Sequence, residues 1–424
     1  MPPMIKTLSR PPFPSGWGSI PTTLSNLSLS NTLPVGQSFL WHKRTLPAAG
    51  PDEPLEEYSR AIRNPCRVIF LRQSIHRLHY VSLLPDGSTS KDEETRQWLE
   101  DYFQLVDYPD LSLLYKEWRD RDTELFGKIE FDSKAIGVRV LRQDPWECLI
   151  SFITSTNNHI TRISSLMHKL SINYSKPLFT IEQFEGSSSI TYHPFPIPED
   201  FPDSFETNLR QLGFGYRASF IESSIKSLRQ QFGSNPGSIE KGLVDLRKKD
   251  LDVIKECLIS LKGVGRKVAD CVMLMSLDQP SLIPVDTHVA SIAARHPSFP
   301  SRLRNKTMSK QMYDDIQLFL ADRWGPLGGW CQAVMFAADL PPIRPVSKLA
   351  QIKAEVSCSV SDESTLFESK NIVMVDQIIQ DVEPISVAKS RSKRSKPTSD
   401  GAENGVVLEH KRTRRVSGMP KSPS

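Results

Sequence analysis

The sequence contains six cysteines, and no two of them form a C-x-x-C pair. Zinc sites and cysteine-bound clusters usually use cysteines at such short spacings, so we expect no metal and no cofactor. Scattered free thiols are typical of a reducing compartment. The chain also lacks an apolar run near the roughly 20 residues needed to cross a bilayer, and we expect no membrane association.

Acidic residues are missing from one end of the chain, and basic residues dominate the other. Residues 1–51 contain no Asp or Glu, but five early prolines oppose the amphipathic helix of an organellar presequence. Residues 385–424 hold ten Lys/Arg and three Asp/Glu, whereas residues 1–340 hold 39 of each sign. Residues 1–340 therefore carry no net charge. If they bind nucleic acid, they must do so through a local patch of positive charge and through backbone N–H donors.

Composition and periodicity divide the chain into four parts. Residues 1–18 are Pro-rich, and we expect them to be disordered. Residues 19–140 are expected to form an α+β domain with an antiparallel sheet, and residues 141–342 an all-helical body. Residues 343–424 are Ser-rich, basic and poor in aromatics, so we expect a disordered tail. The fold class is therefore α+β.

Local signals refine this division. The stretch "LSLSNTL" alternates apolar and polar residues, and "CRVIFLRQSIHRLHYVSLL" reads as two strands. Asp92 or Ser90 is a candidate cap for the helix that follows the turn "LPDGS". Pro145 suits the first turn of another helix. Within the helical part, "GSSSITYHPFPIPEDFP" is an interruption rich in Pro and Ser.

The stretch "LKGVGRKVADC" (261–271) predicts a hairpin between two helices. Four apolar residues at helical spacing precede it: Leu251, Ile254, Leu258 and Leu261. Gly263 and Gly265 then end the helix, and both can adopt positive φ. Gly263, Val264 and Gly265 therefore present backbone N–H groups at the start of the next helix, which favours a phosphate site. An ordinary helix corner is the alternative interpretation.

Lys267 lies in the first turn of that next helix. The helix dipole and the neighbouring Arg266 disfavour a positive charge there, which favours a neutral, nucleophilic amine. Asp286, in "PVDTH", is a natural N-cap for the helix 288–295, and its carboxylate can face the hairpin. An amine and a carboxylate together suit the cleavage of an N-glycosidic bond. A solvated lysine and a simple capping aspartate are the alternatives.

Five strings, in order, resemble the eukaryotic 8-oxoguanine DNA glycosylases, a family with a helix–hairpin–helix and a Gly/Pro-rich loop ending in Asp. They are "LPVGQSFLW", "LRQDPWECLISFITSTNNHITRI", "LRQLGFGYRA", "LKGVGRKVADCVMLMSLDQPSLIPVDTHV" and "WGPLGGWCQAVMFAADL". The resemblance covers about residues 15–342. It implies that Lys267 is the nucleophile that forms a Schiff base and that Asp286 is the family aspartate.

The resemblance also implies a pocket for a base flipped out of the duplex. The Gly36 carbonyl would accept a hydrogen bond from N7–H of 8-oxoguanine. Gln332 would contact the Watson–Crick edge, while Phe336 and Cys271 would cover the two faces of the base. Gln332 and Phe336 are four residues apart, so both can point into one pocket.

Further residues are implied to contact DNA. Asn157 would fill the space left by the extruded base, and Arg162 and Arg217 would contact the orphaned cytosine. Tyr216 would wedge beside the gap, and His288 would contact a phosphate or cap its helix. His159 stands where the family commonly has a third Asn, which leaves the opposite-base preference open.

The predicted function is therefore a bifunctional DNA glycosylase and AP lyase, a monomer that excises 8-oxoguanine opposite cytosine from double-stranded DNA. Two alternatives stay open: a helix–hairpin–helix glycosylase for another lesion, such as an alkylated purine, or a non-catalytic DNA-binding protein. The basic runs 389–396 and 411–415 suggest nuclear import, with a mitochondrial form as a second expectation. The tail is also a candidate segment for binding repair or import partners.

Overall fold

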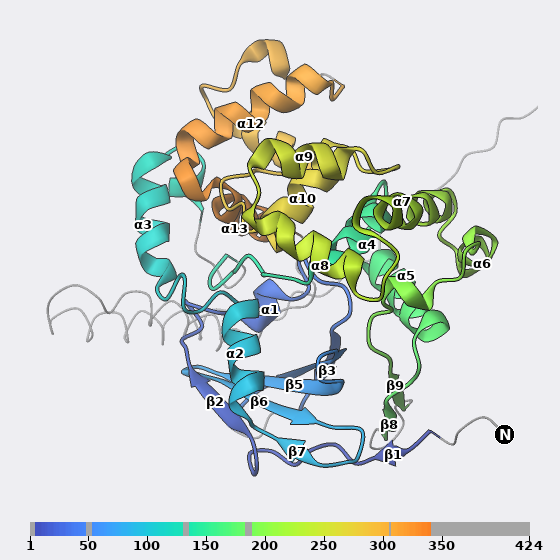
Figure 1. The fold of residues 1–424 in the computed structure, drawn as a ribbon. Helices are drawn as coiled ribbons and strands as arrows, with labels where there is room; N and C mark the ends of the chain where they lie inside the picture. The colour runs from blue at the N-terminus through green and yellow to red at the C-terminus, as the bar shows by residue number, and fades with distance from the viewer. Residues whose placement is uncertain (1–4, 48–52, 130–134, 183–188, 305–306, 341–424) are drawn as a thin grey trace, which may run out of the picture. The chain divides into compact units, whose positions relative to one another are not determined.

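A computed structural model describes residues 5–47, 53–129, 135–182, 189–304 and 307–340 (Figure 1). The predicted disordered tail, 343–424, lies outside these residues. The described chain starts with a β-rich part and continues as helices, so the predicted α+β class is confirmed. Among the described helices, none is long and apolar enough to cross a membrane.

The larger sheet is antiparallel and has the strand order β2-β6-β5-β4-β3, with β7 paired to β6. Its strands are β2 (Gly18–Pro21), β3 (His42–Thr45), β4 (Glu56–Ile62), β5 (Arg67–Ser74), β6 (Arg77–Leu83) and β7 (Thr89–Ser90). The hairpin of β5 and β6 is the predicted pair of strands. Ile69 and Leu71 pack toward α2 (Glu93–Tyr102), whereas Val68 and Phe70 pack on the opposite face. Burial on both faces explains the continuous apolar run from Val68 to Leu71 in β5.

A second sheet covers that opposite face and joins residues from the start and the middle of the described chain. It joins β1 (Thr7–Leu8), β8 (Phe179–Ile181) and β9 (Ile190–Tyr192), with β1 parallel to β8. Phe179, Ile181 and Tyr192 pack with Val68 and Phe70 in one buried cluster. Residues 5–18 thus differ from the disorder expected of them, and two strands lie within the range expected to be helical.

The stretch "LSLSNTL" is not a strand, as its alternation had suggested, but contains the short helix α1 (Leu29–Thr32). Leu29 and Thr32, three residues apart, are both buried. The N–H of Leu29 donates to Oε1 of Gln73 (2.8 Å), and the Thr32 hydroxyl donates to the Gly137 carbonyl (3.0 Å). Contacts distant in sequence therefore select a helical turn over a strand.

The remaining helices form the body that carries most of the predicted site residues. They are α3 (Leu111–Arg121), α4 (Pro145–Ser155), α5 (Ile160–Tyr174), α6 (Glu206–Leu212), α7 (Arg217–Phe232), α8 (Ser238–Asp245), α9 (Leu251–Ile259), α10 (Arg266–Ser276), α11 (Thr287–Arg295), α12 (Lys310–Trp324) and α13 (Gly328–Asp339). Short 3-10 helices lie at Phe126–Lys128, Pro198–Asp200, Leu246–Lys248, Ser301–Leu303 and Gly325–Leu327. The predicted helix starts are confirmed. Asp92 caps α2 by accepting from the N–H of Thr95 (2.6 Å), and Pro145 is the first residue of α4.

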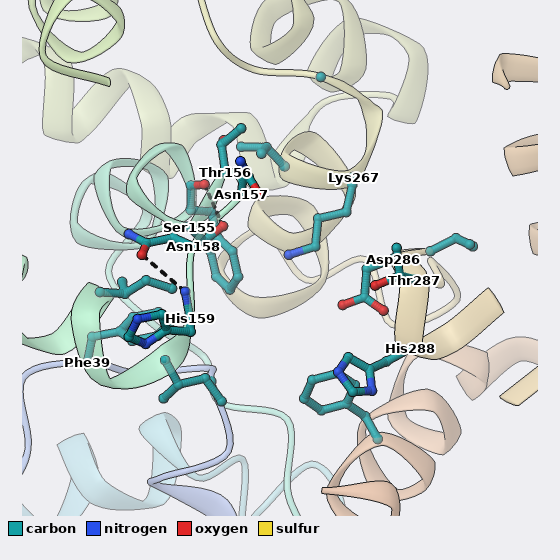
Figure 2. A pocket seen from close by; sticks show the side chains of 18 of the residues that line it. Phe39, Ser155, Thr156, Asn157, Asn158, His159, Lys267, Asp286, Thr287 and His288 are labelled. Carbon is teal, nitrogen blue, oxygen red and sulfur yellow. Dashed lines mark hydrogen bonds between the residues drawn. The ribbon is translucent and has the colours of Figure 1, made fainter. Parts of the chain in front are cut away.

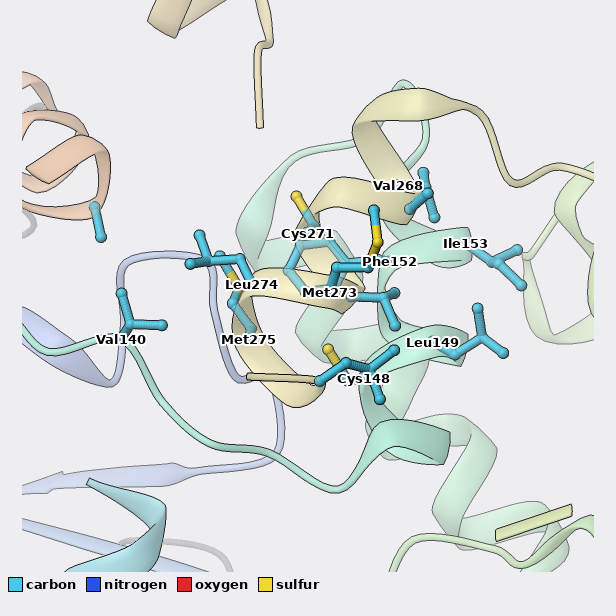
Figure 3. Close-up of a cluster of buried hydrophobic side chains, with 14 of the residues drawn as sticks. Val140, Cys148, Leu149, Phe152, Ile153, Val268, Cys271, Met273, Leu274 and Met275 are labelled. Atoms are coloured by element: carbon cyan, nitrogen blue, oxygen red, sulfur yellow. The ribbon is translucent and has the colours of Figure 1, made fainter. Parts of the chain in front are cut away.

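Helix α10 lies at the centre of the helical core, packed against α4 (Figure 3). Every residue from Val268 to Ser276 is buried, which is typical of a helix enclosed on all sides. Leu149 of α4 and Val272 of α10 are fully buried in this contact. Burial of each such side chain stabilises the fold by about 1.5–3 kcal/mol. Lys267, in the first turn of α10, is therefore mounted on a rigid element.

Candidate active site

A cleft of about 1840 Å³ brings together residues that are far apart in the sequence (Figure 2). It is bordered by the loop after α1, the connection between α4 and α5, the hairpin before α10, the start of α11 and the helix α13. Eight of the predicted site residues line it: Gly36, Asn157, Gly263, Gly265, Lys267, Asp286, His288 and Phe336. Val264, Cys271, Gln332 and Arg217 are instead buried in the surrounding protein.

The predicted hairpin is present between α9 and α10. Gly263 has φ +85°, and a Cβ there would lie 2.4 Å from Cδ2 of Phe220, so this position requires glycine. Gly265 was expected to adopt positive φ as well, but its backbone is extended (φ −90°, ψ 179°) because it is the N-cap of α10. No atom lies within 4 Å of a Cβ built at Gly265. The N-terminus of α10 is therefore open to an approaching phosphate.

The apolar face predicted for α9 is only partly buried. Ile254 and Leu258 are fully buried, and Leu261 is buried just beyond the end of the helix. Leu251, the first residue of α9, is 38% exposed. The hairpin is thus anchored by the second half of α9 and the turn that follows it.

Lys267 points into the cleft, and its Nζ lies 5.2 Å from the centre of the Phe152 ring (Figure 2). The neighbouring Arg266 is ion-paired with Asp314 of α12, and its guanidinium lies 4.7 Å from the ring centre of Tyr313. The charge of Arg266 is therefore compensated by Asp314 and is not directed at Lys267, contrary to the sequence argument. Phe152 supplies the apolar surface beneath the amine.

Asp286 is the N-cap of α11, as predicted, and its Oδ1 accepts a hydrogen bond from the N–H of Val289 (2.9 Å). Burial raises the pKa of the Cys271 thiol to about 11; the Lys267 ammonium opposes this shift, and the Asp286 carboxylate adds to it. Both predicted reacting groups therefore act electrostatically on one buried thiol. Because its pKa is high, Cys271 stays protonated at neutral pH and does not compete with the amine as a nucleophile.

Two of the lining residues, His288 and Phe336, contact each other. The rings of His288 and Phe336 meet edge to face with centres 5.7 Å apart. Nδ1 of His288 is 3.7 Å from Oδ2 of Asp339, which also pairs with Arg295 (2.6 Å). Asp339 is therefore ion-paired with Arg295 and lies beside the imidazole that contacts the Phe336 ring.

Gln332, one turn before Phe336, is 7% exposed, and its Oε1 is buried without a hydrogen-bond partner. An unpaired buried acceptor of this kind costs about 1–3 kcal/mol. Such a group is a common feature of a site that is completed by a bound molecule. Donors on a ligand would satisfy it.

The 8-oxoguanine DNA glycosylase N-terminal domain matches residues 19–149. The chain is 32% identical over 350 residues to the N-glycosylase/DNA lyase of Saccharomyces cerevisiae, covering 76% of this chain and 86% of the yeast protein. It is 30% identical over 353 residues to the N-glycosylase/DNA lyase OGG1 of Arabidopsis thaliana, covering 81% and 88%. A solved structure of Clostridium acetobutylicum 8-oxoguanine glycosylase/lyase, with DNA containing cytosine opposite 8-oxoG, is 25% identical. Its TM-score is 0.56, with 74% of this chain and 91% of that chain covered.

The chain belongs to the eukaryotic 8-oxoguanine DNA glycosylases. It is an enzyme, a DNA N-glycosylase and DNA lyase. The family membership predicted from the five sequence strings is therefore confirmed.

In this glycosylase, the connection between α4 and α5 is held by residues of α7. Asn157 has φ +47°, which is uncommon for a residue other than glycine. Arg217 is 3% exposed, and its guanidinium donates to the carbonyls of Thr156 (2.9 Å) and Asn157 (2.8 Å). The Tyr216 hydroxyl also donates to the Thr156 carbonyl (3.2 Å), although its side chain is 44% exposed. These bonds fix Asn157 at the edge of the cleft.

His159, which also lines the cleft, and Arg162 lie at the end of the same connection. His159 is the N-cap of α5, and its Nδ1 accepts from the N–H of Arg162 (3.4 Å). The Arg162 guanidinium donates to the Gly213 carbonyl (3.2 Å). His159 therefore takes over the capping role that an asparagine can also fill.

Some residues of the glycosylase site were missed by sequence reasoning. Phe152, beneath Lys267, occurs in an apolar helical stripe and looked like an ordinary core residue. Ile160 lies within 3.1 Å of where a Gly36 Cβ would be, so it limits the space around that glycine. No local pattern in the sequence distinguishes these two residues from other buried apolar side chains.

Proposed function

We propose that this glycosylase excises 8-oxoguanine paired with cytosine by forming a Schiff base at Lys267, and then cleaves the strand by β-elimination. The observation that carries the proposal is the placement of Lys267 and Asp286 in one cleft with Gly36 and Phe336. The similarity to the Clostridium acetobutylicum 8-oxoguanine glycosylase/lyase, solved with DNA containing cytosine opposite 8-oxoG, supports the choice of substrate. The proposed mechanism uses no metal and no cofactor.

The chemistry begins at C1′ of the damaged nucleotide. The neutral Lys267 amine attacks C1′, the N-glycosidic bond breaks, and its electron pair leaves with the base, which takes up a proton. The Asp286 carboxylate stabilises the positive charge that develops on the sugar. The attacking nitrogen loses a proton, and its electron pair then breaks the C1′–O4′ bond while O4′ takes up a proton, which gives an iminium at C1′. A C2′ proton is lost to water, the C3′–O bond breaks, and the 3′ phosphate leaves with the electron pair. Water then hydrolyses the iminium and returns the free Lys267 amine.

Recognition of the damaged base would rest on two groups. The Gly36 carbonyl would accept from N7–H, a donor that 8-oxoguanine has and guanine lacks. The unpaired Oε1 of Gln332 would accept from the N–H groups on the Watson–Crick edge, which satisfies its missing bond. Phe336 and the Cys271 thiol would cover the faces of the base.

Selectivity for the opposite base would come from the connection between α4 and α5. Asn157 would enter the space left by the flipped nucleotide, while Tyr216 wedges beside it. Arg162 and Arg217 now donate to backbone carbonyls. When DNA binds, some of the N–H groups of these two guanidinium groups would donate to the orphaned cytosine. The open N-terminus of α10 and His288 would hold phosphates.

Borohydride trapping tests this function directly. Wild-type protein should form a covalent complex with duplexes containing 8-oxoguanine, and most strongly when the opposite base is cytosine. Lys267→Ala should abolish trapping and strand cleavage but keep DNA binding, whereas Lys226→Ala, outside the cleft, should behave as wild type. Base release by wild-type protein without any trapped complex would contradict covalent catalysis by the amine.

We further propose that the protein acts as a monomer in the nucleus, which is where its DNA substrate is concentrated. The basic runs 389–396 and 411–415 support nuclear import. A fluorescent fusion should lose nuclear accumulation when both runs are replaced by Ser and Gly. Nuclear accumulation that is unchanged by this replacement would contradict the assignment.

A further inference from the structure

A buried polar cluster connects α10, α12 and the segment that leads to Asp286. At its centre is Asp270, three residues after Lys267 on α10 and 1% exposed. Its Oδ2 accepts hydrogen bonds from the Tyr313 hydroxyl (2.6 Å) and from Nε2 of Gln317 (2.9 Å), both on α12. Because buried carboxylates are costly unless hydrogen-bonded, these two donors must stay in place.

The same two residues of α12 also hold the backbone just before Asp286. The Tyr313 hydroxyl accepts from the N–H of Val285 (3.1 Å), and Nε2 of Gln317 donates to the carbonyl of Ile283 (3.0 Å). The segment between α10 and α11 has no regular secondary structure, so its backbone needs such partners from elsewhere. Asp286 is thus placed by bonds that end on α12.

Tyr313 contacts the hairpin side of the site as well. Its ring lies beneath the Arg266 guanidinium, 4.7 Å from Cζ to the ring centre, and Arg266 is also ion-paired with Asp314. One side chain therefore touches the residue before Lys267 and the residue before Asp286. Burial and the Asp270 carboxylate raise the pKa of Tyr313, so its hydroxyl keeps its proton and donates to Asp270 at any working pH.

We propose that Tyr313 is a positioning residue that sets the distance between the Lys267 amine and the Asp286 carboxylate. This inference rests on the proposed roles of these two groups. Loss of the hydroxyl would leave the buried N–H of Val285 without its acceptor and remove one donor from Asp270. Asp286 would then shift, and a displacement near 1 Å is enough to slow an enzymatic reaction about a hundredfold.

The variant Tyr313→Phe isolates the hydroxyl, because the ring and its contact with Arg266 remain. The matched control is Tyr192→Phe, since Tyr192 is also buried and its hydroxyl bonds to Ser59 (2.7 Å), while neither of these two residues lines the cleft. We expect single-turnover release of 8-oxoguanine to fall about ten- to hundredfold in Tyr313→Phe. DNA affinity should change less than twofold, and Tyr192→Phe should excise at the wild-type rate.

A double-mutant cycle with Asp286→Asn separates positioning from general damage to the fold. If Tyr313 acts through Asp286, then Tyr313→Phe should slow base release much less in the Asp286→Asn background than in the wild type. Equal effects in both backgrounds, or a wild-type rate for Tyr313→Phe, would overturn the inference. Failure of the proposed function would appear differently, as the absence of borohydride trapping by the wild-type protein itself.

Discussion

The two glycines of the hairpin should respond to alanine in opposite ways, because only one of them is enclosed. At Gly263 the backbone has φ +85°, and an added Cβ would lie 2.4 Å from Cδ2 and 2.8 Å from Cβ of Phe220. At Gly265 the backbone is extended, and an added Cβ meets no atom within 4 Å. Gly263→Ala should therefore damage the fold, and Gly265→Ala should not.

The size of the effect follows from two costs at Gly263. A left-handed conformation costs a residue with a Cβ about 1–2 kcal/mol, and inserting a carbon into a packed core costs a further ~1–3 kcal/mol. Their sum, about 2–5 kcal/mol, lowers Tm by about 4–10 °C at roughly 2 °C per kcal/mol for a chain of this size. At Gly265 the expected loss is that of a poorer N-cap, about 1 kcal/mol or less.

Thermal unfolding and DNA binding, measured on both variants, give the test. Gly265→Ala should melt within about 2 °C of wild type. It should nevertheless bind duplex DNA several-fold more weakly, because its methyl group occupies the space through which a phosphate approaches the N–H groups of α10. If Gly263→Ala melts like wild type, or if Gly265→Ala is the less stable of the two, the reasoning about this turn is wrong.

Two other predictions concern stability. Gln332→Met removes a buried acceptor that has no hydrogen-bond partner among the described residues, so it should raise the free energy of unfolding by about 1 kcal/mol. The same variant should excise 8-oxoguanine more slowly. A lower free energy of unfolding in urea would contradict this reasoning. Burial, reinforced by nearby positive charge, lowers the pKa of His42 to about 4 and of His168 to about 3, so the folded protein binds fewer protons than the unfolded chain as pH falls below about 6.5. These two histidines therefore lower the stability of the folded protein as the pH falls from about 6.5 toward 4. In the double variant His42→Gln/His168→Gln, the unfolding free energies measured at pH 7.5 and at pH 4.5 should differ by less than they do in the wild type.

Features governed by neighbouring residues could be predicted from the sequence. Asp92, Pro145 and Asp286 start their helices as expected, because a cap needs only a side chain and the N–H two or three residues later. The strands of the hairpin 67–83 were predictable for a similar reason, since their partners are adjacent in the chain. The sequence alone also identified Lys267 as a candidate nucleophile, because a positive charge is disfavoured in the first turn of a helix.

Features that depend on distant partners could not be predicted in this way. Thr7 pairs with Thr180, and no pattern within the first 18 residues indicates that partner. The stretch "LSLSNTL" forms a helical turn because Gln73 and Gly137 offer bonds to it. Whether Gly265 would be extended depended on its role as the N-cap of α10. For Thr7 and for "LSLSNTL", the deciding contact joins segments that are far apart in sequence.

The two proposed reacting groups are held in different ways, and this difference explains why the cluster around Asp270 exists. Lys267 belongs to α10, whose residues from Val268 onward are all buried, so close packing fixes this helix. Asp286 ends a segment without regular structure, where packing supplies fewer constraints and hydrogen bonds must supply the rest. Asp270 lies on the buried helix α10 and accepts a hydrogen bond from the Tyr313 hydroxyl, which in turn accepts one from the N–H of Val285. These two bonds connect the segment before Asp286 to α10. The geometry of amine and carboxylate is thereby set by α10 together with α12, although Lys267 and Asp286 are on separate elements.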